Sequence, residues 1–265
     1  MRILKDFCGI LICIIVYTII ILVACGVIFL AIKPISDEGY FDFDLMVGIY
    51  LPFLVLSLTS HFACMVTDPG ILNKQNTVEI YKSLLEEDNK ENVCTYCNVW
   101  KPPRTHHCMT CRSCILNMDH HCPWVNNCIG FYNQKYFLLF LVYTLIGVII
   151  SEGFLFCKVL ANTIEGIEKS RFEAFFLTFT IVVAGVFFLM ISSILSDQIK
   201  AIVNNTSGID VLQHKNFVKR PLYVNLQEIF GGKLSPLWLI PTPISGKPKK
   251  VVERGYEAPK TQDNS

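Results

Sequence analysis

The apolar positions of this chain gather in four long runs that polar segments separate. The runs lie near residues 7–32, 45–66, 137–160 and 174–195. A helix needs roughly 20 residues to cross the hydrocarbon layer of a bilayer, which is about 30 Å thick. Each run reaches that length, so the pattern predicts an all-α integral membrane protein with four transmembrane helices.

Two of these runs need interpretation. The first could be a cleavable signal peptide, but its apolar stretch exceeds the usual about 7 to 15 residues, and no small-residue cleavage site precedes Lys33 and Pro34. We interpret it as a retained helix. The third run carries Glu152 and Lys158 near its far end, and each must reach the interface or a partner inside the bundle. We favour a snorkelling or helix-pairing role for Glu152 over a role in chemistry.

Composition agrees with a membrane protein and excludes one large class of partner. Hydrophobic residues make up 52% of the chain and charged residues only 17%. The 23 basic residues nearly balance the 22 acidic ones, whereas a nucleic-acid-binding protein needs a clustered excess of Lys and Arg. We therefore expect no nucleic-acid partner.

The distribution of the basic residues predicts the topology. Nineteen of the 23 Lys and Arg lie before the first run, between the second and third, or after the fourth, whereas the loop 33–44 has one Lys among four acids. By the positive-inside rule both termini and the middle segment are cytosolic, so the sequons at Asn204 and Asn205 should carry no glycan. Helices of about 22 residues suit thinner bilayers, which favours an endomembrane, Golgi or ER, over the plasma membrane.

These boundaries divide the chain into four parts. They are transmembrane helices 1 and 2 (1–66), a cytosolic cysteine-rich module (67–136), transmembrane helices 3 and 4 (137–195) and a cytosolic C-terminal region (196–265). The module opens with Asp68, Pro69 and Gly70, which predict a helix stop and turn. A polar stretch of helical or loop character, 73–92, follows.

The second half of the module is rich in metal ligands. Seven of the chain's twelve Cys and four of its six His lie between Cys94 and Cys128. In a reducing cytosol, pairs of Cys with two residues between them favour tetrahedral zinc over disulfides. Two closed zinc sites use eight ligands and the cluster offers eleven, so three are free for another purpose. Spacing alone does not tell which ligand belongs to which metal.

The same residues resemble, position for position, the cysteine-rich domain of the DHHC-type protein S-acyltransferases (palmitoyltransferases). The matching positions are Cys94, Cys97, His107, Cys108, Cys111, Cys114, Asp119, His120, His121, Cys122, Cys128, Asn133 and Phe137. Asp68-Pro69-Gly70 is similar to the family's DPG motif, and the segment 225–241 to its C-terminal Asn-containing motif. The resemblance therefore reaches nearly the whole chain.

The resemblance implies a particular set of ligands for each of two structural zinc ions. One set is Cys94, Cys97, His107 and Cys114, and the other is Cys108, Cys111, His121 and Cys128. His106, His120 and Cys122 are then left over, with Asp119 beside them.

The leftover residues can form a nucleophilic site. A free thiol has a pKa of about 8.5, so a nucleophilic Cys122 needs a neighbouring base. His120 is the available base, and Asp119 can hold its other ring nitrogen. Because adjacent residues of a strand or helix point apart, we expect zinc-bound His121 and Pro123 to impose an irregular turn in which His120 faces Cys122. An inert buried thiol is the alternative for Cys122.

The resemblance implies transfer of a long-chain acyl group, palmitoyl, from acyl-CoA through a Cys122 thioester to cysteines of substrate proteins near the membrane. It suggests that Lys101, Arg104 and His106 face the CoA head group; without it they are as readily solvated surface. Trp124 would cap the reacting carbonyl or serve as an interfacial aromatic. The cavity for the acyl chain should be lined by the third and first helices, and membrane lipid is a further expected partner.

Two further expectations concern single positions. Gly147 leaves space in the acyl cavity, so we expect chains at least as long as palmitate to be accepted. The family's Thr-Thr-x-Glu motif is replaced by residues 207–210, with Gly208 in place of the second Thr. If a hydroxyl orients Asp119, Thr206 or Ser207 must supply it from a shifted register. This departure leaves room for an accessory subunit.

Two rival functions are compatible with a zinc-bearing membrane protein. A scaffold with an inactive docking module would bind zinc but carry no hydroxylamine-labile acyl group. A membrane ubiquitin ligase with a RING-like cross-brace would need different ligand spacing after Cys97 and would leave Cys122 without a purpose.

Overall fold

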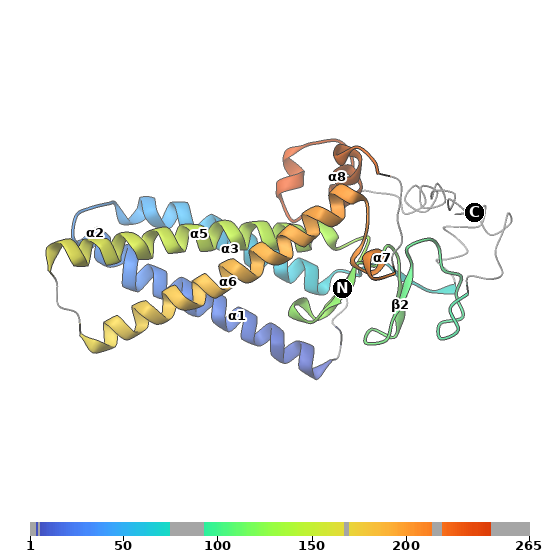
Figure 1. The fold of residues 1–265 in the computed structure, drawn as a ribbon, viewed down its shortest axis with the longest axis horizontal. Coiled ribbons are helices and arrows are strands. Elements are labelled where there is room, and N and C mark those ends of the chain that lie inside the picture. Colours follow the sequence, from blue (N-terminus) through green and yellow to red (C-terminus); the bar gives the residue numbers. More distant parts are fainter. Residues whose placement is uncertain (1–3, 5, 75–92, 167–169, 214–218, 245–265) are drawn as a thin grey trace, which may run out of the picture.

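Four long helices form a bundle, and a small module of short strands lies at one end of it in the computed structural model (Figure 1). The structure describes residues 4, 6–74, 93–166, 170–213 and 219–244. The predicted helical or loop stretch 73–92 lies almost wholly outside these residues.

All four helices are long and apolar enough to span a membrane, so the chain is a multi-pass membrane protein. The first span, Phe7–Asp37, joins α1 (Phe7–Val27), a short π-helical turn (Ile28–Ile32) and α2 (Lys33–Asp37). The others are α3 (Phe43–Val66), α5 (Gln134–Glu165) and α6 (Arg171–Asn204). The predicted membrane helices are therefore confirmed.

The last two helices are longer than their apolar runs. The helix α5 has 32 residues and α6 has 34, which at 1.5 Å per residue gives α6 a length of about 50 Å. Local signals set their outer ends: Ser170 and Glu173 form a capping box before α6, and Gly166, with φ 64°, ends α5. At the other end α6 runs past residue 195, so it reaches over the strand module.

The two charged residues near the far end of the third apolar run, Glu152 and Lys158, behave differently. The ammonium of Lys158, which is buried, pairs with the carboxylate of Glu38 beyond α2. Glu152 points toward α6, with Oε1 3.7 Å from the position of a Cβ built on Gly185. That oxygen has no hydrogen-bond partner among the described residues. Its contact with α6 fits the helix-pairing interpretation better than snorkelling.

The strand module consists of two small antiparallel sheets. The first has the order β1-β3-β2, from Ile71–Leu72, Ser113–Ile115 and His106–Cys108, and the second pairs β4 (His120–Cys122) with β5 (Asn127–Ile129). A 3₁₀ turn, η2 (Pro123–Val125), links β4 to β5. The described part of the cysteine-rich module is thus built from short strands and turns, although the protein as a whole is mostly helical.

Asparagine side chains of the module fasten it to the bundle. The Asn127 amide nitrogen donates to the carbonyls of Cys64 at 3.1 Å, Met65 at 3.2 Å and Thr67 at 2.8 Å, which are orphan acceptors at the end of α3. Asn133 closes the following turn, donating to the carbonyl of Cys128 at 2.7 Å. These bonds hold the β4–β5 hairpin against the end of the membrane helix.

The C-terminal segment covers the same end of the bundle. It contains α7 (Gly208–Leu212), α8 (Leu222–Phe230) and the 3₁₀ turn η3 (Pro236–Leu239). Asn225 of α8 donates to the carbonyl of Ile202 near the end of α6 at 2.7 Å. Lys135 at the start of α5 donates to the carbonyls of Leu237 at 2.8 Å and Thr242 at 3.0 Å. The α7 helix is thereby held beside the module.

Candidate active site and metal sites

Two groups of side chains in the module could each hold a metal ion. Within each group the ligand atoms all lie within 4.8 Å of one another. One group is Cys94, Cys97, His107 and Cys114; the other is Cys108, Cys111, His121 and Cys128. These are the two sets that the family resemblance implies.

The distances within each group match those of a tetrahedral zinc site. The thiolate sulfurs lie 3.2–3.9 Å from Nδ1 of His107 in the first group and 3.5–3.7 Å from Nδ1 of His121 in the second. With Zn–S near 2.3 Å and Zn–N near 2.0 Å, a tetrahedron requires S···N separations of about 3.5 Å. Both groups are therefore suited to zinc, and neither uses a carboxylate.

Strand pairing brings the ligands together. The register sets His107 opposite Cys114 and His121 opposite Cys128. After each Cys pair the chain turns back through a residue of positive φ, Asn98 at 52° and Arg112 at 50°. This left-handed conformation lets the thiols of two Cys with two residues between them face the same point.

His106, His120 and Cys122 lie outside both groups. His120 and Cys122 are the first and third residues of β4, so their side chains lie on the same face of the strand, while His121 between them faces the second metal group. The expected irregular turn is wrong, because plain strand alternation already separates the ligand from the other two side chains. The two side chains lie close enough to interact, since Cys122 contributes to the raised pKa of His120.

The Asp119 carboxylate completes this arrangement. Its Oδ2 lies 2.8 Å from Nδ1 of His120, and Asp119 is buried. Burial by itself lowers the pKa of His120, but hydrogen bonds to Asp119 and Cys122 outweigh it and raise that pKa to about 9. Burial likewise opposes ionisation of Asp119, whose pKa is nevertheless lowered by the contact with His120. A protonated His120 beside the Asp119 carboxylate is therefore the favoured state.

Asp119 is held from two further directions. The amide nitrogen of Gln198, on the part of α6 that reaches past the bundle, donates to Oδ2 at 2.8 Å. The backbone N–H of Gly208, the first residue of α7, donates to Oδ1 at 2.6 Å. A Cβ built on Gly208 would lie 3.2 Å from the Asp119 carbonyl oxygen, so glycine allows the close approach.

The expected hydroxyl is therefore not what orients Asp119. The Ser207 hydroxyl instead accepts the Asp210 backbone N–H at 3.1 Å, and Asp210 accepts the Ser207 N–H at 2.9 Å, which caps α7. The backbone replaces the side chain that the family motif would supply. Nothing in the chain signalled Gln198 as part of this site, because it lies in a polar stretch after the fourth apolar run, far from the cysteine cluster.

Of the three residues predicted to contact the CoA head group, Arg104 has partners in the C-terminal part of the protein. The Arg104 guanidinium lies 3.4 Å from Oδ2 of Asp210 and donates to the Asn205 side-chain oxygen at 3.1 Å. It therefore ties the module to α7. Lys101 and His106 are half-buried. Nothing tests their contact with CoA, which stays a prediction.

An apolar pocket opens beside the thiol of Cys122, which is only 3% exposed. The pocket has a volume of about 210 Å³ and is lined by side chains of α1, the β4–η2 segment, α5 and α6, among them Trp124 and Phe137. Trp124 is 42% exposed, so it is both a wall of the pocket and a surface aromatic. His120 and Cys122 are the pocket's polar end.

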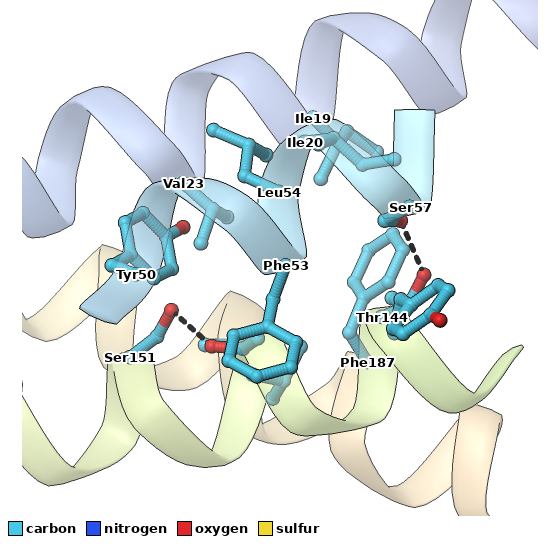
Figure 2. Close-up of a pocket in the computed structure, with 14 residues that line it drawn as sticks. Ile19, Ile20, Val23, Tyr50, Phe53, Leu54, Ser57, Thr144, Ser151 and Phe187 are labelled. Carbon is cyan, nitrogen blue, oxygen red and sulfur yellow. Dashed lines mark hydrogen bonds between the residues drawn. The ribbon is translucent and has the colours of Figure 1, made fainter. Parts of the chain in front are cut away.

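A second cavity of about 50 Å³ lies deeper in the bundle, and Phe187 lines both (Figure 2). Its other walls come from all four helices, rather than only the third and first as expected. Gly147 is among them, and a Cβ built there would have no atom within 4 Å. Ser57 and Thr144 are hydrogen-bonded across it at 2.7 Å.

A bundle of four membrane-spanning helices, bearing a Cys/His module that is suited to two zinc ions and retains a free Cys beside His and Asp, defines a class of membrane enzyme. The family model described as DHHC palmitoyltransferase matches residues 87–215. The chain is 35% identical to palmitoyltransferase ZDHHC3 of Homo sapiens over 257 residues, covering 92% of this chain and 85% of that protein.

Other relatives agree. Palmitoyltransferase ZDHHC7 of Rattus norvegicus is 31% identical over 250 residues, covering 90% of this chain and 80% of that protein. A probable protein S-acyltransferase 13 of Arabidopsis thaliana is 32% identical over 225 residues, covering 76% and 73%. The chain belongs to the DHHC palmitoyltransferase family and is a protein S-acyltransferase.

Proposed function

We propose that this enzyme moves a long-chain acyl group, palmitoyl, from acyl-CoA to Cys122 and then to cysteines of substrate proteins at the cytosolic membrane face. One observation carries the proposal. Cys122 lies outside both metal groups, shares one face of β4 with His120, and opens into an apolar pocket between membrane helices. A nucleophile, a proton carrier and a place for an acyl chain thus meet at one point.

In the first step the Cys122 thiolate attacks the thioester carbonyl of acyl-CoA. A carbon–sulfur bond to Cys122 forms, the bond to CoA breaks, and the CoA thiolate takes the proton held by His120. In the second step a substrate cysteine gives its proton to His120 and attacks the acyl-enzyme, and Cys122 leaves as a thiolate. Asp119 keeps the imidazole oriented and stabilises its charge. One thioester replaces another, so no nucleotide hydrolysis is required.

The metal groups have a structural role in this proposal. Zinc bound by the two sets would fold and stiffen the module, whose two small hydrophobic clusters include several of the ligand cysteines. Cys128 and His121, opposite each other on β5 and β4, would hold the hairpin whose other residues carry the reaction. Metal held by these residues would serve the fold of the module and would take no part in acyl transfer.

The apolar pockets give the acyl chain its place in the membrane. Burial of the chain contributes about 0.8 kcal/mol per CH₂, which favours a chain between the helices and a carbonyl at Cys122. We infer that Lys101, Arg104 and His106 meet the phosphates of CoA and that Trp124 covers the carbonyl.

We infer the orientation from the asymmetry of basic residues. The module 67–136 and both termini, including 196–265, would face the cytosol, and the helices of 1–66 and 137–195 would cross a Golgi or ER membrane. Partners are membrane lipid, acyl-CoA and proteins with membrane-proximal cysteines. The altered motif at residues 207–210 would also leave room for an accessory subunit.

The test is Cys122→Ser in the purified full chain, incubated with labelled palmitoyl-CoA. The serine variant should keep two zinc ions per chain and carry no hydroxylamine-labile label, whereas the wild type is labelled. Cys157→Ser is the matched control, since Cys157 is exposed on α5 and outside both metal groups. Unchanged labelling of Cys122→Ser would remove the thioester mechanism. Zinc without labelling of the wild type would favour the inactive scaffold.

A further inference from the structure

His61 is a buried polar residue that the acyl-transfer mechanism does not use. It lies near the end of α3, closest to the module, and its side chain has no exposure to solvent. Both ring nitrogens have partners: Nδ1 lies 3.0 Å from the Tyr17 hydroxyl of α1, and Nε2 lies 3.0 Å from the backbone carbonyl oxygen of Trp124. One side chain therefore connects two membrane helices to the catalytic segment.

The partners determine how the protons are arranged. A backbone carbonyl can only accept, so Nε2 must carry the hydrogen and donate it to Trp124. Nδ1 of the neutral ring is then an acceptor, and the Tyr17 hydroxyl donates to it. The chain runs in one direction, from Tyr17 through His61 to the Trp124 carbonyl.

The accepting carbonyl belongs to the turn that follows the nucleophile. Trp124 is the middle residue of η2, two residues after Cys122, and its carbonyl also accepts from the thiol of Cys13 on α1 at 3.5 Å. A buried carbonyl without donors at the membrane boundary carries a large desolvation cost. The turn is therefore bound to the bundle by its main chain and not only by side-chain packing.

Aromatic packing fixes the imidazole itself. Its ring lies edge-on to Tyr17 and to Phe140, with centroid distances of 4.9 Å in both cases. Phe140 lines the pocket beside Cys122, together with Trp124. Any shift of the His61 ring would therefore move a pocket wall and the turn at the same time.

We propose that His61, held by Tyr17, is a positioning residue for acyl transfer: its Nε2–H fixes the Trp124 carbonyl and thereby the geometry of Cys122 at the mouth of the acyl pocket. The inference rests on the proposed function of Cys122. Strand pairing with β5 holds Cys122 on one side only, at Asn127. His61 fixes the other side, where β4 gives way to η2.

The experiment compares three substitutions of His61 in purified full chain in vesicles, with palmitoyl-CoA as donor. His61→Phe keeps a ring and removes the donor; His61→Gln restores an amide N–H at the reach of Nε2; His61→Asn is polar but too short to reach. His61→Phe and His61→Asn should lower the single-turnover rate of Cys122 acylation on the order of tenfold, as expected for a lost hydrogen bond to a buried carbonyl.

His61→Gln should recover to within about threefold of wild type, while KM for palmitoyl-CoA changes less than about twofold in all three. Zinc content and thermal unfolding are measured on the same samples. Tyr17→Phe, which removes only the hydroxyl, should slow acylation by about threefold. This variant tests the inference even if His61→Phe does not fold.

Equal rates for His61→Gln and His61→Phe, or a wild-type rate in Tyr17→Phe, would overturn the inference. So would a loss of rate that only follows lost zinc or lost folded protein. A different result, in which wild type takes no acyl group or Cys122→Ser still takes one, would overturn the proposed function itself. The two failures are therefore distinguishable.

Discussion

The strand module and the helix bundle are ordered by opposite means. The module has strands of two or three residues and is organised around two groups of four ligands. The bundle has helices of up to 34 residues, held by apolar packing and a few interhelical bonds such as Ser57 to Thr144. Ligands act through directional bonds between few atoms, whereas packing spreads over many contacts, each weak. A single substitution should therefore abolish the fold of the module, whereas substitutions in the bundle should lower its stability gradually.

The active site belongs to neither region alone. Cys122 and His120 come from the module, the acyl pocket comes from the bundle, and Asp119 is held by Gln198 of α6 and Gly208 of α7. Four substitutions, in order of decreasing effect, test how far each region acts by itself.

The largest effect is expected from removing one ligand of the second metal group. Cys108→Ala should lose metal and fold of the module together, because structural zinc contributes roughly 10–16 kcal/mol in small zinc domains, as much as the whole stability of a typical domain. Zinc content and protease resistance of the module measure it. Cys157→Ala, a free Cys of the bundle, should retain both. Retention of two zinc ions by Cys108→Ala would contradict the ligand assignment.

Asp119→Asn should leave the module folded and disable the reaction. An amide cannot stabilise the imidazolium of His120, so the acylation rate should fall by roughly 10² to 10⁴-fold. The measurement is single-turnover labelling of Cys122 from palmitoyl-CoA, with zinc content as the control for folding. A rate within a few fold of wild type would mean that Asp119 is structural only.

Gln198→Leu tests the bond between bundle and module. The variant removes one donor from Asp119 Oδ2 but keeps His120 and Gly208 as partners, so acylation should slow by about tenfold. Lys200→Ala is the matched control, because Lys200 lies on the same helix, is exposed and pairs with Asp197. If both variants behave alike, the reach of α6 over the module has no role in catalysis.

Gly147→Phe should change specificity more than rate. A benzyl group would fill the open space of the deeper cavity, so preference should shift from palmitoyl-CoA to shorter acyl-CoAs. Gly153→Phe is the control, since Gly153 is on the same helix, also meets no neighbouring atom and does not line the cavity. Competition between acyl-CoAs of different length measures the shift, and an unchanged preference in Gly147→Phe would refute it.

Much of the fold follows from local pattern. Runs of apolar residues predicted all four membrane helices, since spanning depends on length and hydropathy alone. The ends were less predictable: α5 and α6 extend several residues beyond their apolar runs, because a helix continues wherever tertiary contacts satisfy its exposed turns. Lys158 was expected to need a partner, yet its identity, Glu38, depends on how α2 and α5 meet.

The chemistry of the site was also partly readable. The spacing of the cysteines, in pairs with two residues between them, and the family resemblance together indicated eight ligands and a surplus thiol. They could do so because such ligands are neighbours in the chain. His120 and Cys122 needed no irregular turn, since strand alternation sets them on one face. That error came from not predicting β4.

By itself, then, the amino-acid sequence determined which residues can bind metal, which thiol remains and which segments enter the membrane. These properties depend on residue type and on short spacing. Only the tertiary structure decided that Gln198 and the N–H of Gly208 hold Asp119 and that His61 holds the turn after Cys122. Those partners are 79, 89 and 63 positions away in the chain. These partners meet because α3 and α6 pack against the module. The role of the Gly208 backbone N–H could not be predicted from residue type, because nearly every residue has a backbone N–H.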